Sequence, residues 1–299
     1  MQIKKATFLA LVVSAVLFGA SAQAQSHRCT DSSNFAAHAN NPDNNGACYA
    51  TPQSLTLKVH EFGLCKSASS PSDKSDCTAL FVSAAGRDMQ MASGRSLSLM
   101  DQISLEEGTY THAYLVLNTL VKMETLIDFG SNQRTDLQGR TGRYCFTNGN
   151  DYNTTPADIV ECSNSLTNMA EASETIGLGI LGNTYSNTEL GYQISVGGVT
   201  VNMDLYMVDS AGNLSTSYND DFAIFGSQAL TSPVNITQST SGLDIAVAVT
   251  DMTEVAFSNP LSPNLIIGYN NTTFTCNETT NGCLFDMAWN GLQFVITAQ

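Results

Sequence analysis

Residues 103–118, ISLEEGTYTHAYLVLN, carry the strongest fold signal in this 299-residue chain. From Tyr110 onwards alternate residues fall on two faces, one holding Ala113 and Leu115 and the other Tyr110 and His112. A period of two is the signature of a β-strand. The Gly-Thr-Tyr step at its start fits two interpretations, a chemical site around His112 or a structural lock at the entry to the strand. We favour the lock.

The lock is predicted by the spacing of Leu105, Gly108 and Tyr110, which resembles the tyrosine corner of Greek-key sandwiches. In that corner a tyrosine at the start of a strand donates its hydroxyl to backbone a few residues upstream. Gly108 permits the close approach, and Leu105 is expected to fill the core beneath it. The pattern resembles immunoglobulin-like and transthyretin-like sandwiches. With the segment LKVHEFGLC (57–65) it is also similar to uncharacterised exported proteins of marine bacteria. The resemblance implies a topology and no activity.

Strand-like alternation recurs along the chain and indicates an all-β protein. Gly197 and Gly198 separate two alternating arms, which predicts a hairpin with a two-residue turn. One segment, 166–175, has helix-like character instead. Short strands joined by Gly, Asn and Ser turns predict an antiparallel Greek-key β-sandwich with long polar loops. The further segments with strand character are 54–62, 79–84, 120–129, 192–196, 199–208, 221–230, 243–250, 265–276 and 292–298.

Residues 1–24 have the form of a secretory signal peptide. Lys4 and Lys5 form a basic start, residues 6–20 are apolar, and residues 22–24 (AQA) match the small-x-small cleavage pattern. The apolar run is shorter than the roughly 20 residues that a membrane-spanning helix needs. We therefore expect a protein secreted by a Gram-negative-type bacterium, without membrane insertion. It would reside in the periplasm, at the cell surface or outside the cell.

Beyond the leader we expect three parts. Residues 25–52 form a polar, disulfide-tied N-terminal segment, residues 53–164 a first half of the β-sandwich, and residues 165–299 a second half. The alternative is one continuous domain, because a chain of this length fits either arrangement.

The eight cysteines all follow the predicted cleavage site, and an even number in an exported chain favours disulfides over metal thiolates. They fall in four separated pairs, and the stretches between paired cysteines are polar and turn-rich. We predict four local bridges, each closing one loop and each worth roughly 2–4 kcal/mol. The metal alternative needs a C-x2–4-C spacing, which this chain lacks. The predicted bridges are Cys29–Cys48, Cys65–Cys77, Cys145–Cys162 and Cys276–Cys283.

The charge balance restricts the partners. Without Lys4 and Lys5, 10 basic residues stand against 27 acidic ones, a formal charge of −17. Nucleic acids and anionic membranes bind clustered Lys and Arg, so this balance argues against both. Charged residues make up 13% of the chain, about half of the usual quarter. Low charge with abundant Thr and Asn is common in exported β-proteins.

The sequence contains no recognisable catalytic motif. No G-x-S-x-G, HExxH or phosphate-binding glycine loop is present, and all four histidines lie in the first 112 residues. His60 and His112 are interpreted as strand residues, packed on one side and hydrated on the other. Neighbouring carboxylates such as 106–107 and 220–221 point apart on a strand and are interpreted as solvated turns. We therefore predict no enzyme, no catalytic residue and no bound organic cofactor.

Calcium is the one cofactor to which a pattern points. Asn41, Asp43 and Asn45 occupy alternate positions ahead of a glycine, like the start of an oxygen-ligand loop. The position of the bidentate glutamate in a complete EF-hand loop is Pro52, so the full motif is absent. Residues 148–153 and 218–221 are further candidates for hard-cation ligands. The alternative is that these are Asn-rich turns beside disulfides.

The last segment, GLQFVITAQ (291–299), alternates as a strand. Such a strand pairs with the edge of a neighbouring subunit, or simply closes the sandwich. We predict a secreted, non-enzymatic structural or surface protein that assembles with itself or with other exported proteins through strand edges. The alternative is an extracellular β-sandwich module that binds glycan or protein, with calcium.

Overall fold

All the regular elements of the described residues are β-strands, which confirms the predicted all-β class. The computed structural model describes residues 28–29, 47–91, 96–97, 105–151, 154–155, 158–175, 180–181, 184–185, 190–196, 199–216, 222–250, 252–257, 264–267, 272–276, 283–289 and 293–298. The predicted leader and the predicted glycine turn at 197–198 lie outside these residues. In the described part of the chain, no helix is long and apolar enough to cross a membrane.

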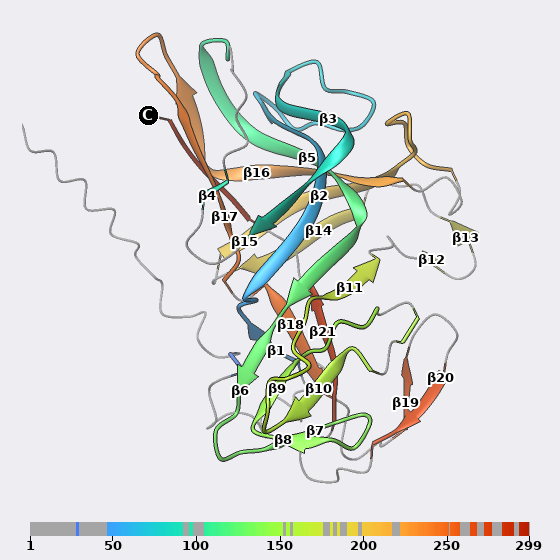
Figure 1. Ribbon diagram of the computed structural model, residues 1–299. Helices are drawn as coiled ribbons and strands as arrows, with labels where there is room; N and C mark the ends of the chain where they lie inside the picture. The colour runs from blue at the N-terminus through green and yellow to red at the C-terminus, as the bar shows by residue number, and fades with distance from the viewer. Residues whose placement is uncertain are drawn as a thin grey trace, which may run out of the picture.

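A large antiparallel sheet dominates the upper part of Figure 1. Its central strand is β5 (Gly108–Glu124), which contains the stretch that begins at the Gly-Thr-Tyr step. A short strand, β11 (Ala172–Thr175), pairs with the C-terminal end of β5. Across the sheet the order is β14 (Leu190–Val196), β15 (Val199–Val208), β16 (Ala223–Ile236), β5, β2 (Ser54–Cys65) and β3 (Cys77–Met91).

A smaller sheet packs against this large one, so that this end of the molecule is a sandwich. It is built from β22 (Gln293–Ala298), β17 (Leu243–Ala248) and β4 (Ser96–Leu97), in that order. The rings of Phe62 and Phe294 lie 5.0 Å apart, one from each sheet. The backbone N–H of Phe294 donates to the side chain of Gln228 on β16 at 3.0 Å. Strand β22 therefore packs against the large sheet.

The second group of sheets lies at the other end of the molecule, where β5 ends (Figure 1). One buried cluster nevertheless extends through both ends and includes Leu115, Val255 and Met287. Strands from both sides of Ser165 share the sheets, so the position of a domain boundary there stays a prediction. One sheet of this group has the order β1 (Ala47–Ala50), β18 (Thr253–Phe257), β21 (Cys283–Trp289), β7 (Arg134–Asp136) and β8 (Thr141–Gly142). The other sheet has the order β10 (Val160–Ser163), β9 (Tyr144–Thr147) and β6 (Leu126–Asp128). Two further pairs of strands are β12 (Ile180–Leu181) with β13 (Thr184–Tyr185) and β19 (Asn264–Ile267) with β20 (Thr272–Thr275).

The helix-like interpretation of residues 166–175 is wrong. The segment passes through a turn near Leu166 and then enters β11, which pairs with β5. The Glu171 carboxylate just before β11 accepts hydrogen bonds from Ser54 and Thr56 of β2, both at 2.9 Å. Pairing with a long strand and these polar contacts outweigh a weak local helical preference.

The four predicted disulfides are present, and no described cysteine is free. Two of them join residues directly opposite each other on paired strands, Cys65 with Cys77 on β2 and β3, and Cys145 with Cys162 on β9 and β10. Each of these two bridges therefore closes a loop between two antiparallel strands.

Candidate functional site

The residues of the Gly-Thr-Tyr step form a structural contact. Tyr110 is fully buried, and its hydroxyl donates to the backbone carbonyl of Glu106, four residues upstream, at 3.1 Å. Leu105 packs against the core cluster, as expected. Gly108 has a φ of 153°, a conformation that side chains disfavour. The hydrogen bond predicted for this stretch is thus present.

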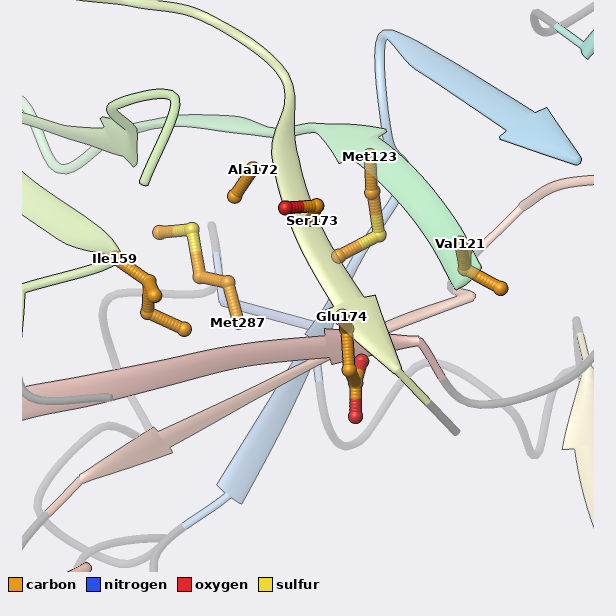
Figure 2. Close-up of a pocket in the computed structure, with 7 residues that line it drawn as sticks. All are labelled: Val121, Met123, Ile159, Ala172, Ser173, Glu174 and Met287. Atoms are coloured by element: carbon orange, nitrogen blue, oxygen red, sulfur yellow. The ribbon is translucent and has the colours of Figure 1, made fainter. Parts of the chain in front are cut away.

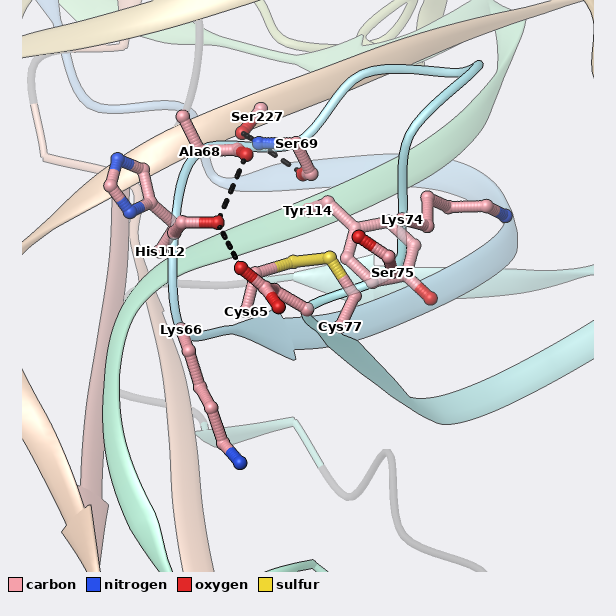
Figure 3. The surroundings of a disulfide bond; sticks show 12 residues. Cys65, Lys66, Ala68, Ser69, Lys74, Ser75, Cys77, His112, Tyr114 and Ser227 are labelled. Atoms are coloured by element: carbon pink, nitrogen blue, oxygen red, sulfur yellow. Dashed lines mark hydrogen bonds between the residues drawn. A yellow bond between two sulfur atoms is a disulfide. The ribbon is translucent and has the colours of Figure 1, made fainter.

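His112, the other candidate in this stretch, lies beside the Cys65–Cys77 bridge (Figure 3). The Thr111 hydroxyl donates to the carbonyl of Lys66 at 2.9 Å, and its oxygen lies 2.8 Å from Nδ1 of His112. Because that hydroxyl proton is already committed, the oxygen acts as the acceptor and Nδ1–H donates to it. Burial lowers the pKa of His112, and the nearby Asp204 carboxylate opposes the shift. The arrangement holds the imidazole in place and favours its neutral form, and it does not activate Thr111 as a nucleophile.

Two serines near His112 connect the loop at 66–76 to the sheet. Both the backbone N–H and the hydroxyl of Ser69 donate to the Ser227 hydroxyl oxygen, at 3.3 Å and 3.2 Å. Both residues are buried. Within the described residues, no hydrogen bond joins the His112 ring to either serine. The serines therefore anchor the loop, and a Ser-His-Asp relay is not assembled here.

A second anchor of the same loop was not predicted from the sequence. The Tyr114 hydroxyl donates to the Glu61 carboxylate at 2.6 Å, and Lys74 from the loop pairs with that carboxylate at 2.8 Å. Burial raises the pKa of Tyr114, and the hydrogen bond to Glu61 adds to the rise. Gly63 lies against the Tyr114 ring so closely that a methyl group there would overlap it. No local sequence signal joins these residues, because the contacts depend on how β2, β5 and the loop at 66–76 align.

His60, the other histidine singled out from the sequence, lies in β2. Its side chain is buried, and its ring packs 4.9 Å from the ring of Phe222. Its Nε2 has no hydrogen-bond partner among the described residues. Among the described residues, no hydrogen bond joins the ring of His60 or of His112 to a carboxylate.

Among the described residues, the largest network of ion pairs surrounds Arg140, at the other end of the molecule. Its guanidinium donates to Asp136 and to Asp158, each at 2.6 Å, and lies 3.8 Å from Glu161. Asp136 is only 1% exposed and also accepts the backbone N–H of Cys162 at 3.0 Å. The arginine therefore occupies the place among these oxygens that a cation would otherwise take.

The cation candidate at residues 148–153 belongs to this same network. The side-chain amides of Asn148 and Asn150 donate to the backbone carbonyl of Asp158 at 2.8 Å and 2.7 Å. These groups hold two loops together. In the described part of the chain, no group of three or more His, Cys, Asp or Glu side chains is arranged to hold a metal ion.

The other calcium candidates, Asn41, Asp43, Asn45 and residues 218–221, lie outside the described residues. Calcium binding by the first three residues therefore stays a prediction.

A small hollow lies between β5, β11 and β21 (Figure 2). Its Met123 sulfur accepts a hydrogen bond from the buried Thr253 hydroxyl at 3.1 Å, and the Ser173 hydroxyl donates to Asp151 at 3.0 Å. Apart from Ser173 and the Glu174 carboxylate, the side chains of the lining are apolar. The lining residues are Val121, Met123, Ile159, Ala172, Ser173, Glu174 and Met287.

The end strands of the sheets form a different kind of candidate. β3 is the last strand of the large sheet and, within the described residues, pairs with β2 alone. Its Val82 side chain is 70% exposed. β22 is the end strand of the smaller sheet and carries the exposed Val295, but its Phe294 amide is already bonded to Gln228. Of these two strands, β3 is therefore the freer for pairing.

Comparison of the chain with known proteins yields no relative. No protein-family model matches it, and neither a curated protein nor a solved structure does. The functional assignment therefore depends on the geometry described above.

Proposed function

We propose that this chain is a secreted, non-enzymatic structural or surface protein that assembles through strand edges. We place it in the periplasm or at the surface of a Gram-negative-type bacterium, or outside the cell. The observation that carries the proposal is β3, a fifteen-residue strand at the end of the large sheet. End strands present unpaired N–H and C=O groups, which are a template for pairing with another chain.

Two further observations support this proposal. Four disulfides suit an oxidising compartment outside the cytosol. The polar groups that most resemble catalytic ones are engaged in holding loops, as with Ser69 on Ser227 and Arg140 on Asp136.

Electron microscopy of the mature, oxidised protein at rising concentration tests this proposal. Ordered assemblies that form reversibly support it. Single particles of constant size at every concentration, with and without calcium, would argue against assembly as an intrinsic property.

The second candidate is a module that binds glycan or protein, and the loop at 66–76 favours it. The Cys65–Cys77 bridge closes this loop, and Ser70 and Asp73 exchange two backbone hydrogen bonds across its tip. Lys74 and Ser69 fasten it to the sheet. A loop held in one conformation loses little entropy on binding, which suits recognition.

A glycan array probed with the mature protein, with and without calcium, tests the second candidate. Binding that is lost when the loop residues Ser70 and Ser72 are both replaced by alanine supports it. Binding unchanged by these replacements would place recognition elsewhere, and an array without any signal would leave no support for a glycan-binding role.

A further inference from the structure

The Cys65–Cys77 bridge differs from the other three disulfides in its access to solvent. Cys77 is partly exposed, whereas the other seven cysteines are buried. The loop on both sides of the bridge, at residues 66–68 and 72–76, is exposed as well. A thiolate in solution breaks a disulfide by attacking one of its sulfur atoms, so the rate depends on access. Of the four bridges, this one is therefore the most open to attack.

Charge favours attack on the same bridge. The loop that it encloses, residues 66–76, contains two lysines and two aspartates and has no net formal charge. The segments that the other three bridges enclose each contain one to three acidic residues and no lysine or arginine. The attacking thiolate is an anion, so acidic neighbours repel it. The loop at 66–76 lacks that local repulsion.

The bridge fixes a part of the fold that has few other backbone contacts. Within the described residues, β3 pairs with β2 alone, and the register shift at Leu80 separates Cys77 from most of that pairing. Cys65, in contrast, lies between β3 and β5 and also pairs with His112. Opening the bridge therefore frees the loop and the start of β3, while β2 stays in the sheet.

The noncovalent contacts that fasten the loop are weak. Lys74 pairs with Glu61 at 2.8 Å, and both side chains are partly exposed. Ion pairs that water reaches contribute little to stability. The Ser69 hydroxyl donates to Ser227 at 3.2 Å, which is a single neutral hydrogen bond between side chains. A loop without its bridge gains conformational freedom, and these contacts offset only part of that gain.

The loop lies over an apolar cluster of the large sheet that is separate from the main core. Cys65 belongs to this cluster, and Cys77 packs against it. The cluster also contains the stacked rings of Tyr114 and Phe225, whose centroids lie 5.6 Å apart. The Lys74 Nζ atom of the loop lies 5.5 Å from the centre of the Tyr114 ring (Figure 3). Release of the loop would therefore expose Tyr114.

We propose that the Cys65–Cys77 bridge is a redox-sensitive switch, which a dithiol opens in the folded protein to release the loop at 66–76. One thiolate of the dithiol attacks the Cys77 sulfur, the S–S bond breaks, and Cys65 leaves as a thiolate that takes up a proton. The second thiol of the dithiol then displaces Cys77 from the mixed disulfide. The chain is left with two thiols, and the dithiol is oxidised to a disulfide. This inference goes beyond assembly through strand edges and does not depend on it.

Timed alkylation during reduction tests the first half of the proposal. The mature, oxidised protein is treated with dithiothreitol in native buffer and quenched with iodoacetamide at intervals, and mass spectrometry of its peptides measures the labelling of each cysteine. Cys65 and Cys77 should be labelled about tenfold or more faster than the other six, because buried bridges react only after local unfolding. Equal rates for all eight cysteines, or earlier labelling of another pair, would overturn the proposal.

Hydrogen exchange tests the release of the loop. After reduction of this bridge alone, residues 66–79 should exchange faster, while exchange in β16 stays as in the oxidised protein. The double variant Cys65→Ser with Cys77→Ser should exchange like the reduced protein. Cys145→Ser with Cys162→Ser is the matched control, since it removes a bridge between two other paired strands, and residues 66–79 should exchange in it as in the wild type.

Unchanged exchange at residues 66–79 after reduction would overturn the switch, even if the bridge were the first to open. Faster exchange throughout the chain would overturn it as well, because reduction would then unfold the protein and not release one loop. The comparison of reduced with oxidised wild type decides between these results even if a variant does not fold.

Discussion

Replacing Tyr110 by phenylalanine tests the interpretation of the Gly-Thr-Tyr step as a structural lock. The change removes one hydroxyl, which donates to the Glu106 carbonyl at 3.1 Å, and keeps the buried ring. A neutral hydrogen bond of this kind contributes about 0.5–1.5 kcal/mol to folding. Glu106 lies in an exposed turn, where water can replace the lost donor. We therefore expect the free energy of unfolding to fall by about 1 kcal/mol.

Equilibrium urea unfolding with all disulfides oxidised measures this loss. Tyr144→Phe is the control, because the Tyr144 hydroxyl makes no hydrogen bond within the described residues and its ring is only half-buried. Its unfolding free energy should stay within about 0.5 kcal/mol of the wild type. Tyr110→Ala, which also removes the ring, should cost about 3–5 kcal/mol.

Equal unfolding free energies for Tyr110→Phe, Tyr144→Phe and wild type would refute the reasoning. The hydroxyl would then contribute nothing, and the bond between Tyr110 and Glu106 could not be called a lock. A loss as large as that of Tyr110→Ala would also refute it, since one neutral hydrogen bond cannot account for so much.

Three further predictions concern the other contacts. Asp136→Ala should lower the free energy of unfolding by about 1–3 kcal/mol in urea titrations, because it removes the buried acceptor of the Cys162 N–H and one of the carboxylates that pair with Arg140. Gly63→Ala should lower it by about 1–3 kcal/mol in the same assay, because the methyl group overlaps the Tyr114 ring. Burial lowers the pKa of His112, so the unfolded chain binds more protons than the folded chain. The free energy of unfolding should therefore fall as the pH drops below about 6.5. His112→Gln should weaken this dependence on pH.

Control variants test the first two of these predictions, and the pH dependence of His112→Gln tests the third. Asp128→Ala breaks an exposed pair with Arg143 and should cost less than Asp136→Ala. Gly226→Ala meets only the flexible ends of Leu205 and Met203, so it should be milder than Gly63→Ala. If the losses were equal within either pair, the assigned contact would not be the cause. An unchanged pH dependence in His112→Gln would remove His112 as its source.

The strands and the disulfides could be predicted because their signals are local. The alternation of residues from Tyr110 to Asn118 predicts a strand without reference to the rest of the chain, and β5 contains these residues. Each pair of cysteines encloses a short polar loop, so the bridge between Cys65 and Cys77 can be predicted without the rest of the fold. The hydrogen bond of Tyr110 spans four residues and is local in the same sense.

Contacts between distant strands could not be predicted, because they depend on register. Glu61 meets Tyr114 only because β2 and β5 align, and Arg140 meets Asp158 only through the folding of two loops. The error at 166–175 has the same origin, since β11 becomes a strand by pairing with β5. For the same reason, the sequence did not predict that β3 would lie at the end of the large sheet, as β22 lies at the end of the smaller one.

Light scattering of the mature, oxidised protein at rising concentration tests the central claim most directly, because it measures mass in solution. Assembly through strand edges predicts an average mass that rises reversibly with concentration and rises further at high salt. A mass that stays at that of one chain under all of these conditions would contradict the claim.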